Sequence, residues 1–277
     1  MEEKLLQMKS LVERLNQASD SYYNGKGELM TDYEWDALFD QLKRLEEETG
    51  EILPDSPTNR VSEDSIVGKK EEHEFAALSL AKTKQVSDLV KWAEDRPIWI
   101  SWKLDGLTLV VTYDGGKLTK IVTRGNGHIG TNITHLAPAI SGIPATISEK
   151  GHLVVRGEAV ISYADFEQFI IEREGDYANP RNLASGSLTL KDIEEVKQRH
   201  IQWIPFTLVY TEREITSWGE RMQMLKDLGM NPVERERIDH PTAENIQQEI
   251  DKFTEKVTSK KNPFPVDGLV ICYDDTV

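Results

Sequence analysis

The chain has 277 residues, of which 38% are hydrophobic and 29% are charged. A chain of this size and composition can bury enough apolar surface for one large domain or two unequal ones, which excludes a disordered protein and a peptide scaffold. Its 33 lysines and arginines stand against 48 aspartates and glutamates, a formal net charge of -15. Because such a field repels phosphate backbones, the charge excludes a protein that coats nucleic acid without specificity.

Cysteines, histidines and apolar runs exclude further classes. The single cysteine, Cys272, rules out an internal disulfide and a multi-cysteine zinc site, and it suits a reducing compartment. The six histidines have no metal-ligand spacing. No apolar run approaches the roughly 20 residues that cross a bilayer, and the N-terminus lacks the order of a signal peptide. We therefore expect a cytoplasmic protein with no membrane partner.

Residues 1–68 predict a helical unit. Apolar residues recur at helical spacing near the N-terminus, which favours a first helix. Thr31 and Glu34 form a capping-box pattern that starts a second helix. The buried stripe of that helix is expected to contain Leu38, Leu42 and Leu45. The polar stretch 54–70 then predicts a connector.

From about residue 98 the pattern changes to that of strands. The predicted strands cover 98–103, 107–113, 118–123, 152–160 and 201–210. The predicted helices begin near Ser162, Thr216 and Thr242. The first three strands follow one another closely, and we expect them to form an antiparallel meander. Strands and helices do not alternate as βαβ units, so the expected class is α+β with a mainly antiparallel sheet.

A short motif places a lysine beside a turn. The segment SWKLDG puts Lys103 at the end of one strand and Asp105 at the bend into the next. Alone, Lys-x-Asp-Gly would occur by chance in roughly one chain in ten of this length, and an exposed strand lysine beside a turn is then the better explanation. Four later motifs follow it in order: TRGNG at 123–127, RGE at 156–158, YANPRN at 177–182 and DGLVI at 267–271. Each offers a glycine, arginine or carboxylate that a nucleotide's phosphate, ribose or metal needs.

This ordered series resembles the covalent nucleotidyltransferase superfamily of DNA ligases, RNA ligases and capping enzymes. More closely, it resembles the adenylation region of the bacterial NAD-dependent DNA ligases, because ATP-dependent relatives have no counterpart to the helical unit. The narrower resemblance is carried by Tyr22-Tyr23, TDYEWD at 31–36, DSPT at 55–58 and LSL at 78–80. It implies a small helical domain, residues 1–68, that binds nicotinamide mononucleotide. An ATP-grasp-like nucleotidyltransferase domain of antiparallel sheets flanked by helices would follow at 69–277.

The resemblance implies that Lys103 attacks the α-phosphorus of NAD and becomes lysyl-adenylate as nicotinamide mononucleotide leaves. This is the first step of sealing nicks in duplex DNA during replication and repair. A lysine has a reference pKa of about 10.4, so its surroundings must favour the neutral amine. Asp105 and Asp267 would organise the lysine or the metal. Magnesium, with Glu158 and Asp267 as ligands, would neutralise charge on the phosphates.

The remaining roles also come from the resemblance. An aromatic face beside carboxylates in the helical unit suits the cationic pyridinium ring, although core filling and surface charge explain Trp35 and Asp36 equally well. Ser79 and Leu80 would border the adenine, and Arg124 would contact the ribose or the phosphate. Arg181 would contact a phosphate, and Glu158 would hold ribose hydroxyls or the magnesium ion. The residues expected to bind NAD are Tyr22, Asp32, Tyr33, Glu34, Trp35, Asp36, Ser79, Leu80, Ser101, Arg124, Glu158, Arg181 and Cys272.

Several positions depart from the usual family pattern. Most members place a lysine that reaches the nucleotide directly after DGLVI, where this chain has Cys272. A glutamate that reads the adenine amino group is replaced by Ser101, and a second arginine after NPRN is replaced by Thr189. The usual TRGDG is TRGNG, with Asn126 in place of the aspartate. These changes indicate a divergent branch or a weakened enzyme.

Three functions are therefore weighed. The first is the adenylation fragment of an NAD-dependent DNA ligase, acting as a monomer that meets nicked duplex DNA mainly through domains absent from this chain. Such a fragment is expected to form the lysyl-adenylate but not to seal nicks efficiently. The second is a degenerate module that binds NAD without adenylyl transfer. The third is an RNA ligase or capping-type enzyme that uses ATP or GTP.

Overall fold

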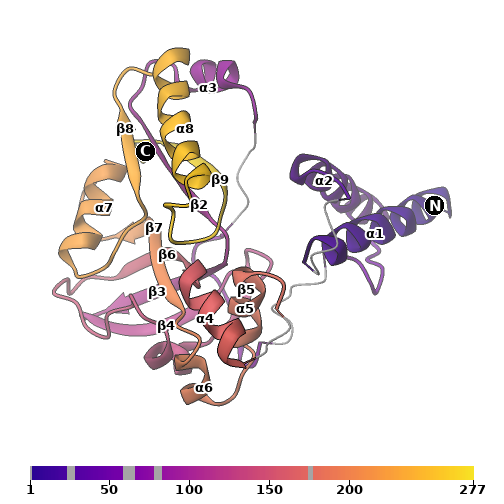
Figure 1. Cartoon of the computed structure of the whole chain (residues 1–277), viewed down its shortest axis with the longest axis horizontal. Coiled ribbons are helices and arrows are strands. Elements are labelled where there is room, and N and C mark those ends of the chain that lie inside the picture. The colour runs from indigo at the N-terminus through magenta and orange to yellow at the C-terminus, as the bar shows by residue number, and fades with distance from the viewer. Residues whose placement is uncertain (1, 24–28, 59–65, 78–82, 174–176) are drawn as a thin grey trace.

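The computed structural model describes residues 2–23, 29–58, 66–77, 83–173 and 177–277. Two helices, α1 (Glu2–Tyr23) and α2 (Asp32–Thr49), pack against each other and lie to one side of a larger body (Figure 1). Their apolar faces form a core of their own around the fully buried side chains of Met8, Leu15 and Leu42. The helical unit expected from the sequence is therefore observed.

The start of α2 follows the predicted capping box. The Thr31 hydroxyl accepts a hydrogen bond from the backbone N–H of Glu34, and the Glu34 carboxylate accepts one from the backbone N–H of Thr31. These two bonds satisfy donors that the first helical turn leaves without partners. The helix ends at Gly50, whose left-handed φ of 68° is a conformation that glycine adopts without steric cost.

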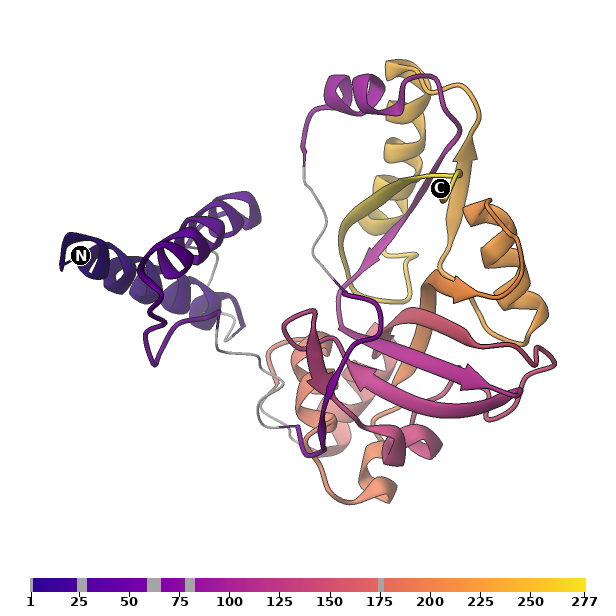
Figure 2. The ribbon, with the colours of Figure 1, turned by 180° about the vertical axis from the view of Figure 1, so that it is seen from behind.

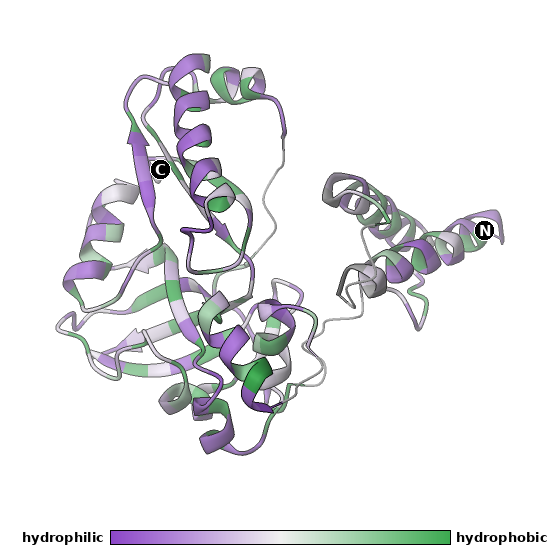
Figure 3. Ribbon diagram, viewed as in Figure 1, coloured by the Kyte–Doolittle hydropathy of each residue, from purple (hydrophilic) through white to green (hydrophobic). Residues whose placement is uncertain are grey.

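The larger body contains a four-stranded antiparallel sheet with the order β4-β3-β6-β7. Its strands are β3 (Leu107–Asp114), β4 (Lys117–Thr123), β6 (Leu153–Val160) and β7 (Gln202–Thr211). A short pair, β1 (Lys70–Glu72) and β5 (Ile129–Thr131), lies beside it. Long hydrophobic stretches on these strands line the main core (Figure 3).

A second antiparallel sheet has the order β8-β2-β9. Its strands are β2 (Ile98–Leu104), β8 (Arg235–Ile238) and β9 (Val266–Tyr273). The predicted meander is thus wrong in one respect, because β2 does not pair with β3. Only β3 and β4 form the expected hairpin, while β2 joins strands from the C-terminal part of the chain (Figure 2).

The bend at Asp105–Gly106 explains why the two strands separate. The Asp105 N–H donates to the carbonyl of Pro265, 2.9 Å away, which ties the end of β2 to the segment before β9. A Cβ on Gly106 would lie 2.1 Å from the carbonyl oxygen of Ala159. The chain therefore passes directly against β6 at this glycine, so β3 begins in the other sheet.

Helices cover both sheets. They are α3 (Val86–Ala93), α4 (Tyr163–Arg173), α5 (Pro180–Ser187), α6 (Ile193–Lys197), α7 (Trp218–Asp227) and α8 (Ala243–Thr258), with a 3-10 helix at Thr134–Ala139. The helix α8 lies on one face of the β8-β2-β9 sheet, where Phe253 meets Trp102 edge to face at 4.7 Å. The α+β class with antiparallel sheets is confirmed. Within the described ranges, no helix is long and apolar enough to cross a membrane.

Candidate active site

Lys103 lies one residue from the end of β2, directly opposite Gly268 of β9. Its Nζ is 3.1 Å from Oδ2 of Asp267, and the two side chains are 40% and 25% exposed. The lysine motif and the DGLVI motif, 164 positions apart, therefore meet at one point.

The bend after Lys103 holds a second ion pair. Asp105 Oδ1 lies 3.3 Å from Nη1 of Arg181, and only 14% of the aspartate side chain is exposed. Arg181 follows Pro180, the first residue of α5, and Asn179 caps that helix by accepting a hydrogen bond from the N–H of Asn182. The NPRN motif therefore positions an arginine beside Asp105, two residues after Lys103, through ordinary helix capping.

Glu158 of β6 lies on the far side of the same bend. Its Oε1 accepts a hydrogen bond from the Thr108 hydroxyl at 2.8 Å, and its Oε2 accepts one from the Gly106 N–H at 3.2 Å. Burial raises the pKa of Glu158 to about 7, against the opposing effects of the Thr108 hydrogen bond and the charge of Arg181. Its carboxyl group therefore changes charge close to neutral pH. Thr108, which sequence reasoning missed, carries no motif of its own and is recognisable only from the pairing of β3 with β6.

Two arginines bind the backbone that follows β1. Arg124 Nε donates to the carbonyl of Ala77 at 2.8 Å, and Arg156 Nη2 donates to the carbonyl of Ala76 at 2.7 Å. Burial and the neighbouring positive charge of Arg124 lower the pKa of Arg156. The sequence predicted Arg124 as a nucleotide contact and did not assign Arg156.

The TRGNG turn depends on its glycine and on Asn126. A Cβ on Gly125, whose φ is +59°, would lie 1.9 Å from the carbonyl oxygen of Ile129. Asn126 Oδ1 accepts hydrogen bonds from the N–H groups of His128 and Ile129 at 2.9 and 2.8 Å. An aspartate oxygen could accept the same bonds, so the asparagine keeps the geometry of the turn while removing one charge.

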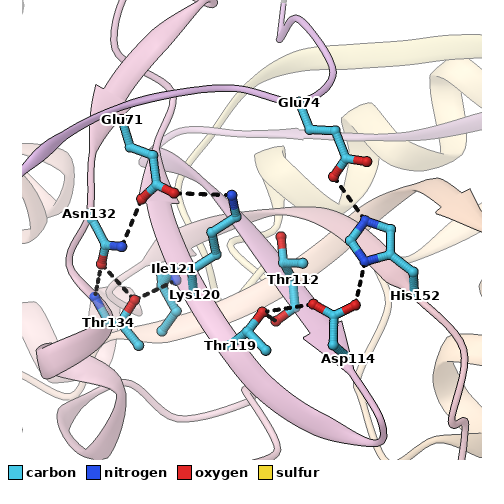
Figure 4. Close-up of polar contacts among 10 residues, drawn as sticks. All are labelled: Glu71, Glu74, Thr112, Asp114, Thr119, Lys120, Ile121, Asn132, Thr134 and His152. Atoms are coloured by element: carbon cyan, nitrogen blue, oxygen red, sulfur yellow. Dashed lines mark hydrogen bonds and ion pairs between the residues drawn. The ribbon is translucent and has the colours of Figure 1, made fainter.

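Side chains of the four-stranded sheet and of the loops beside it hold the connector segment, which we define as residues 70–77 (Figure 4). The carboxylate of Glu71 accepts hydrogen bonds from Lys120 at 3.1 Å and from Asn132 at 2.8 Å. Further along, Glu74 lies 2.8 Å from Nε2 of His152, whose Nδ1 lies 2.6 Å from Asp114.

The carboxylates on both ring nitrogens raise the pKa of His152, with the hydrogen bond to Asp114 as the largest cause and burial opposing it. Because both nitrogens face carboxylates, the doubly protonated ring fits this position best. A charged histidine thus clamps the connector segment to the sheet.

Ser101 and Cys272 lie on the same face of the second sheet as Lys103. Ser101 pairs with Val270, and Cys272 pairs with Trp99. Ser101 is 4% exposed. Burial, with a smaller contribution from Asp274, raises the pKa of the Cys272 thiol to about 12, so the thiol is neutral at physiological pH.

The predicted nicotinamide-binding residues of α2 have structural partners. Glu34 completes the capping box. Trp35 donates a hydrogen bond to the carbonyl of Leu15 at 3.2 Å and stacks on Phe39 with ring centroids 4.9 Å apart. Tyr33 is 58% exposed, with Nζ of Lys84 6.0 Å from its ring centroid.

Helix capping thus accounts for Glu34, and packing between the helices accounts for Trp35. The binding of NAD by these two residues stays a prediction. Asp36 is half-buried in α2. Tyr22 and Asp32 lie in the helices, and their side chains are outside the described residues, as are Ser79 and Leu80 altogether.

Comparison with known proteins identifies the relatives of the chain. Residues 69–277 match the NAD-dependent DNA ligase adenylation domain, and residues 1–62 match the DNA ligase-like, N-terminal NAD+-binding domain. A DNA ligase of Lachnoclostridium phytofermentans is 39% identical over 281 residues, which cover 99% of this chain and 42% of that protein. A DNA ligase of Leptospira biflexa is 36% identical over 273 residues, which cover 96% of this chain and 40% of that protein.

Among solved structures, a mycobacterial DNA ligase D complexed with ATP is 14% identical with a TM-score of 0.38, covering 65% of this chain and 49% of that one. The chain thus spans about two fifths of the length of the curated relatives named above. On the match over residues 69–277 and the identity to these relatives, the chain belongs to the family of NAD-dependent DNA ligase adenylation domains.

Proposed function

We propose that residues 69–277 transfer the adenylyl group of NAD to Lys103, and that residues 1–68 bind the nicotinamide mononucleotide part. The observation that carries the proposal is the meeting of Lys103, Asp267, Asp105, Arg181 and Glu158 around one strand bend. The family match supports NAD as the co-substrate.

In this reaction Nζ of Lys103 forms a bond to the α-phosphorus. The bond between that phosphorus and the bridging oxygen breaks, and its electrons leave with nicotinamide mononucleotide. The amine must lose a proton, and Asp267 Oδ2, 3.1 Å away, is placed to accept it. Arg181, held by Asp105, lies where a guanidinium can stabilise charge that develops on the phosphate.

Magnesium fits this site only together with substrate. Among the described residues, no group of three or more histidines, cysteines and carboxylates is arranged to hold a metal ion. Magnesium ordinarily takes one or two carboxylates plus substrate phosphates, so Glu158 and Asp267 are suitable oxygen donors once NAD is present. When bound, the ion would neutralise charge on the phosphates.

The neutral thiol of Cys272 supports a second candidate, a module that binds NAD without transferring adenylate. Intact-mass measurement after incubation with NAD and magnesium separates the two. We expect an adenylate adduct that disappears in Lys103→Ala and persists in Lys252→Ala, an exposed lysine of α8. Stoichiometric NAD binding without an adduct would favour the module, and an adduct formed from ATP in preference to NAD would favour the ATP-using class.

For the complete ligase we propose nicked duplex DNA as the final substrate, during replication and repair, in the cytoplasm. Names of relatives and the adenylation-domain match support this role. We also propose that the chain is a monomer, which light scattering of the purified protein tests directly. An isolated chain that seals nicks as fast as a full-length relative would contradict the proposal that other domains provide most of the DNA contact.

A further inference from the structure

The face of the β8-β2-β9 sheet opposite α8 carries an arginine that no motif includes. Backbone pairing sets Arg235 of β8 opposite Ser101 of β2, one strand away from Lys103. Side chains alternate along a strand, so residues 235, 101 and 103 lie on one face of the sheet. The other face carries Ile100 and Trp102, against which α8 packs.

The contacts of Arg235 do not neutralise its positive charge. Its Nη1 donates to the carbonyl of Val233 at 3.3 Å, and its guanidinium carbon lies 6.0 Å from the ring centroid of Trp99. Among the described residues, no carboxylate forms an ion pair with it, whereas Arg237 on the same strand pairs with Asp239 and Asp274. Arg235 is half-buried, and burial lowers its pKa from the ordinary value. A half-buried cation of this kind is stabilised by an anionic ligand.

Neither Cys272 nor Lys261 supplies a positive charge on the face of the sheet that carries Lys103. Cys272 is neutral, as shown above. Lys261 lines a groove with Glu236 and Phe253, on the face of the sheet that α8 covers. Arg235 is on the face of the sheet that Lys103 shares.

The reach of the two side chains is sufficient for a common ligand. A strand rises about 3.3 Å per residue and neighbouring strands lie about 4.8 Å apart, so the backbones of Arg235 and Lys103 are roughly 8 Å apart. Two long side chains can meet on one phosphate across this distance. The planar guanidinium offers several donors in a fork that matches phosphate oxygens.

We propose that Arg235 contacts the nucleotide and donates hydrogen bonds to the phosphate of the adenylyl group that Lys103 receives. The inference rests on the proposed adenylation reaction and adds a specific phosphate ligand to it. In this role Arg235 binds and orients the phosphate, and it takes no part in proton transfer. It also gives this chain a positive charge on the sheet face where position 272 supplies none.

The test compares Arg235→Gln with Arg237→Gln, a matched change on the same strand and face at a residue that already has carboxylate partners. Thermal unfolding verifies that both variants fold. Hydrogen bonds to charged groups support a loss of roughly 10- to 100-fold in affinity, and we expect this increase in the KM for NAD and in the Kd for AMP only in Arg235→Gln. Cys272→Lys, introduced into Arg235→Gln, is expected to recover part of the affinity.

Calorimetry with AMP and adenosine distinguishes failure of this inference from failure of the proposed function. An unchanged affinity for AMP in Arg235→Gln, or an equal loss in Arg237→Gln, overturns the inference. An equal loss for adenosine and AMP indicates a contact to the nucleoside and also overturns it. If the parent protein forms no adduct from NAD, the proposed function fails, and AMP binding still decides the role of Arg235. A parent protein that binds no AMP overturns the inference, while adduct formation from NAD still decides the proposed function.

Discussion

Nζ of Lys103 lies 3.1 Å from Oδ2 of Asp267, although the two residues are 164 positions apart in the chain. The contact depends on the pairing of β2 with β9, which sets Lys103 opposite Gly268, the residue after Asp267. In the proposed reaction this carboxylate would accept the proton that the amine loses.

Asp267→Asn removes that proton acceptor while keeping the size of the side chain. General-base catalysis contributes typically 10²- to 10⁴-fold, so we expect the rate of lysyl-adenylate formation to fall about 100-fold at neutral pH. Intact-mass time courses with NAD measure the rate. Asp239→Asn, on the exposed end of β8, is the control and should leave it unchanged. A rate for Asp267→Asn within twofold of the parent would exclude proton transfer to this carboxylate.

Glu158 is expected to make stability depend on pH. Its pKa is about 7 in the folded chain and 4.5 as the ordinary value, so the folded state holds the proton more tightly than the unfolded state. The resulting stabilisation is present below pH 4.5 and is lost as pH rises through 7, an upper limit of about 3 kcal/mol. Glu158→Gln should remove this part of the pH dependence.

Urea unfolding at a series of pH values between 5 and 8 measures how the free energy of unfolding depends on pH. The control is Glu220→Gln in the exposed first turn of α7. An unfolding free energy that falls equally with pH in Glu158→Gln and in the parent would contradict the raised pKa.

Patterns among neighbouring residues were sufficient to predict where single helices and strands lie in the sequence. Thr31 and Glu34 predicted the start of α2, and the SWKLDG segment predicted a lysine at a strand end, because capping and strand alternation involve neighbouring residues. The division into two sheets was not predictable in this way. It depends on the close approach of Gly106 to Ala159, which lie far apart in the sequence.

The candidate site was predictable where it coincides with motifs, and not elsewhere. Lys103, Arg181 and Glu158 lie around one strand bend, and the roles that the resemblance implies for them stay predictions. The short strand β8, with the sequence RERI, has no hydrophobic alternation, so nothing identified Arg235 as a neighbour of Ser101. The groups that bind Arg124 and Arg156 are backbone carbonyls. Every residue has a backbone carbonyl, so no residue type in the sequence marks these two.

Because His152 forms ion pairs with Glu74 and Asp114, we predict that the connector segment is held less firmly as pH rises. A histidine whose pKa is raised on folding contributes stability below its ordinary value of 6.5, and that contribution is lost as pH rises through the folded value. We expect hydrogen exchange of amides 70–77, corrected for the intrinsic rate, to accelerate as pH rises above 6.5.

His152→Gln should exchange rapidly in this segment at every pH. His240→Gln is the matched control, since His240 is highly exposed and faces one aspartate only. Exchange of the connector segment that is independent of pH in the parent protein would show that the charge of His152 does not hold it.

Gly106→Ala tests the close contact that separates the two sheets. An added Cβ would lie 2.1 Å from the carbonyl oxygen of Ala159, a backbone atom that cannot move without distorting β6. Overpacking costs typically 1–3 kcal/mol, so we expect a loss of about 3 kcal/mol in the free energy of unfolding, measured by urea titration. Gly186→Ala in α5 is the control, because its Cβ would meet the ring of Tyr177 at 3.0 Å and a side chain can shift. A smaller loss for Gly106→Ala than for Gly186→Ala would show that the bend after Lys103 adjusts, and that its geometry does not depend on glycine.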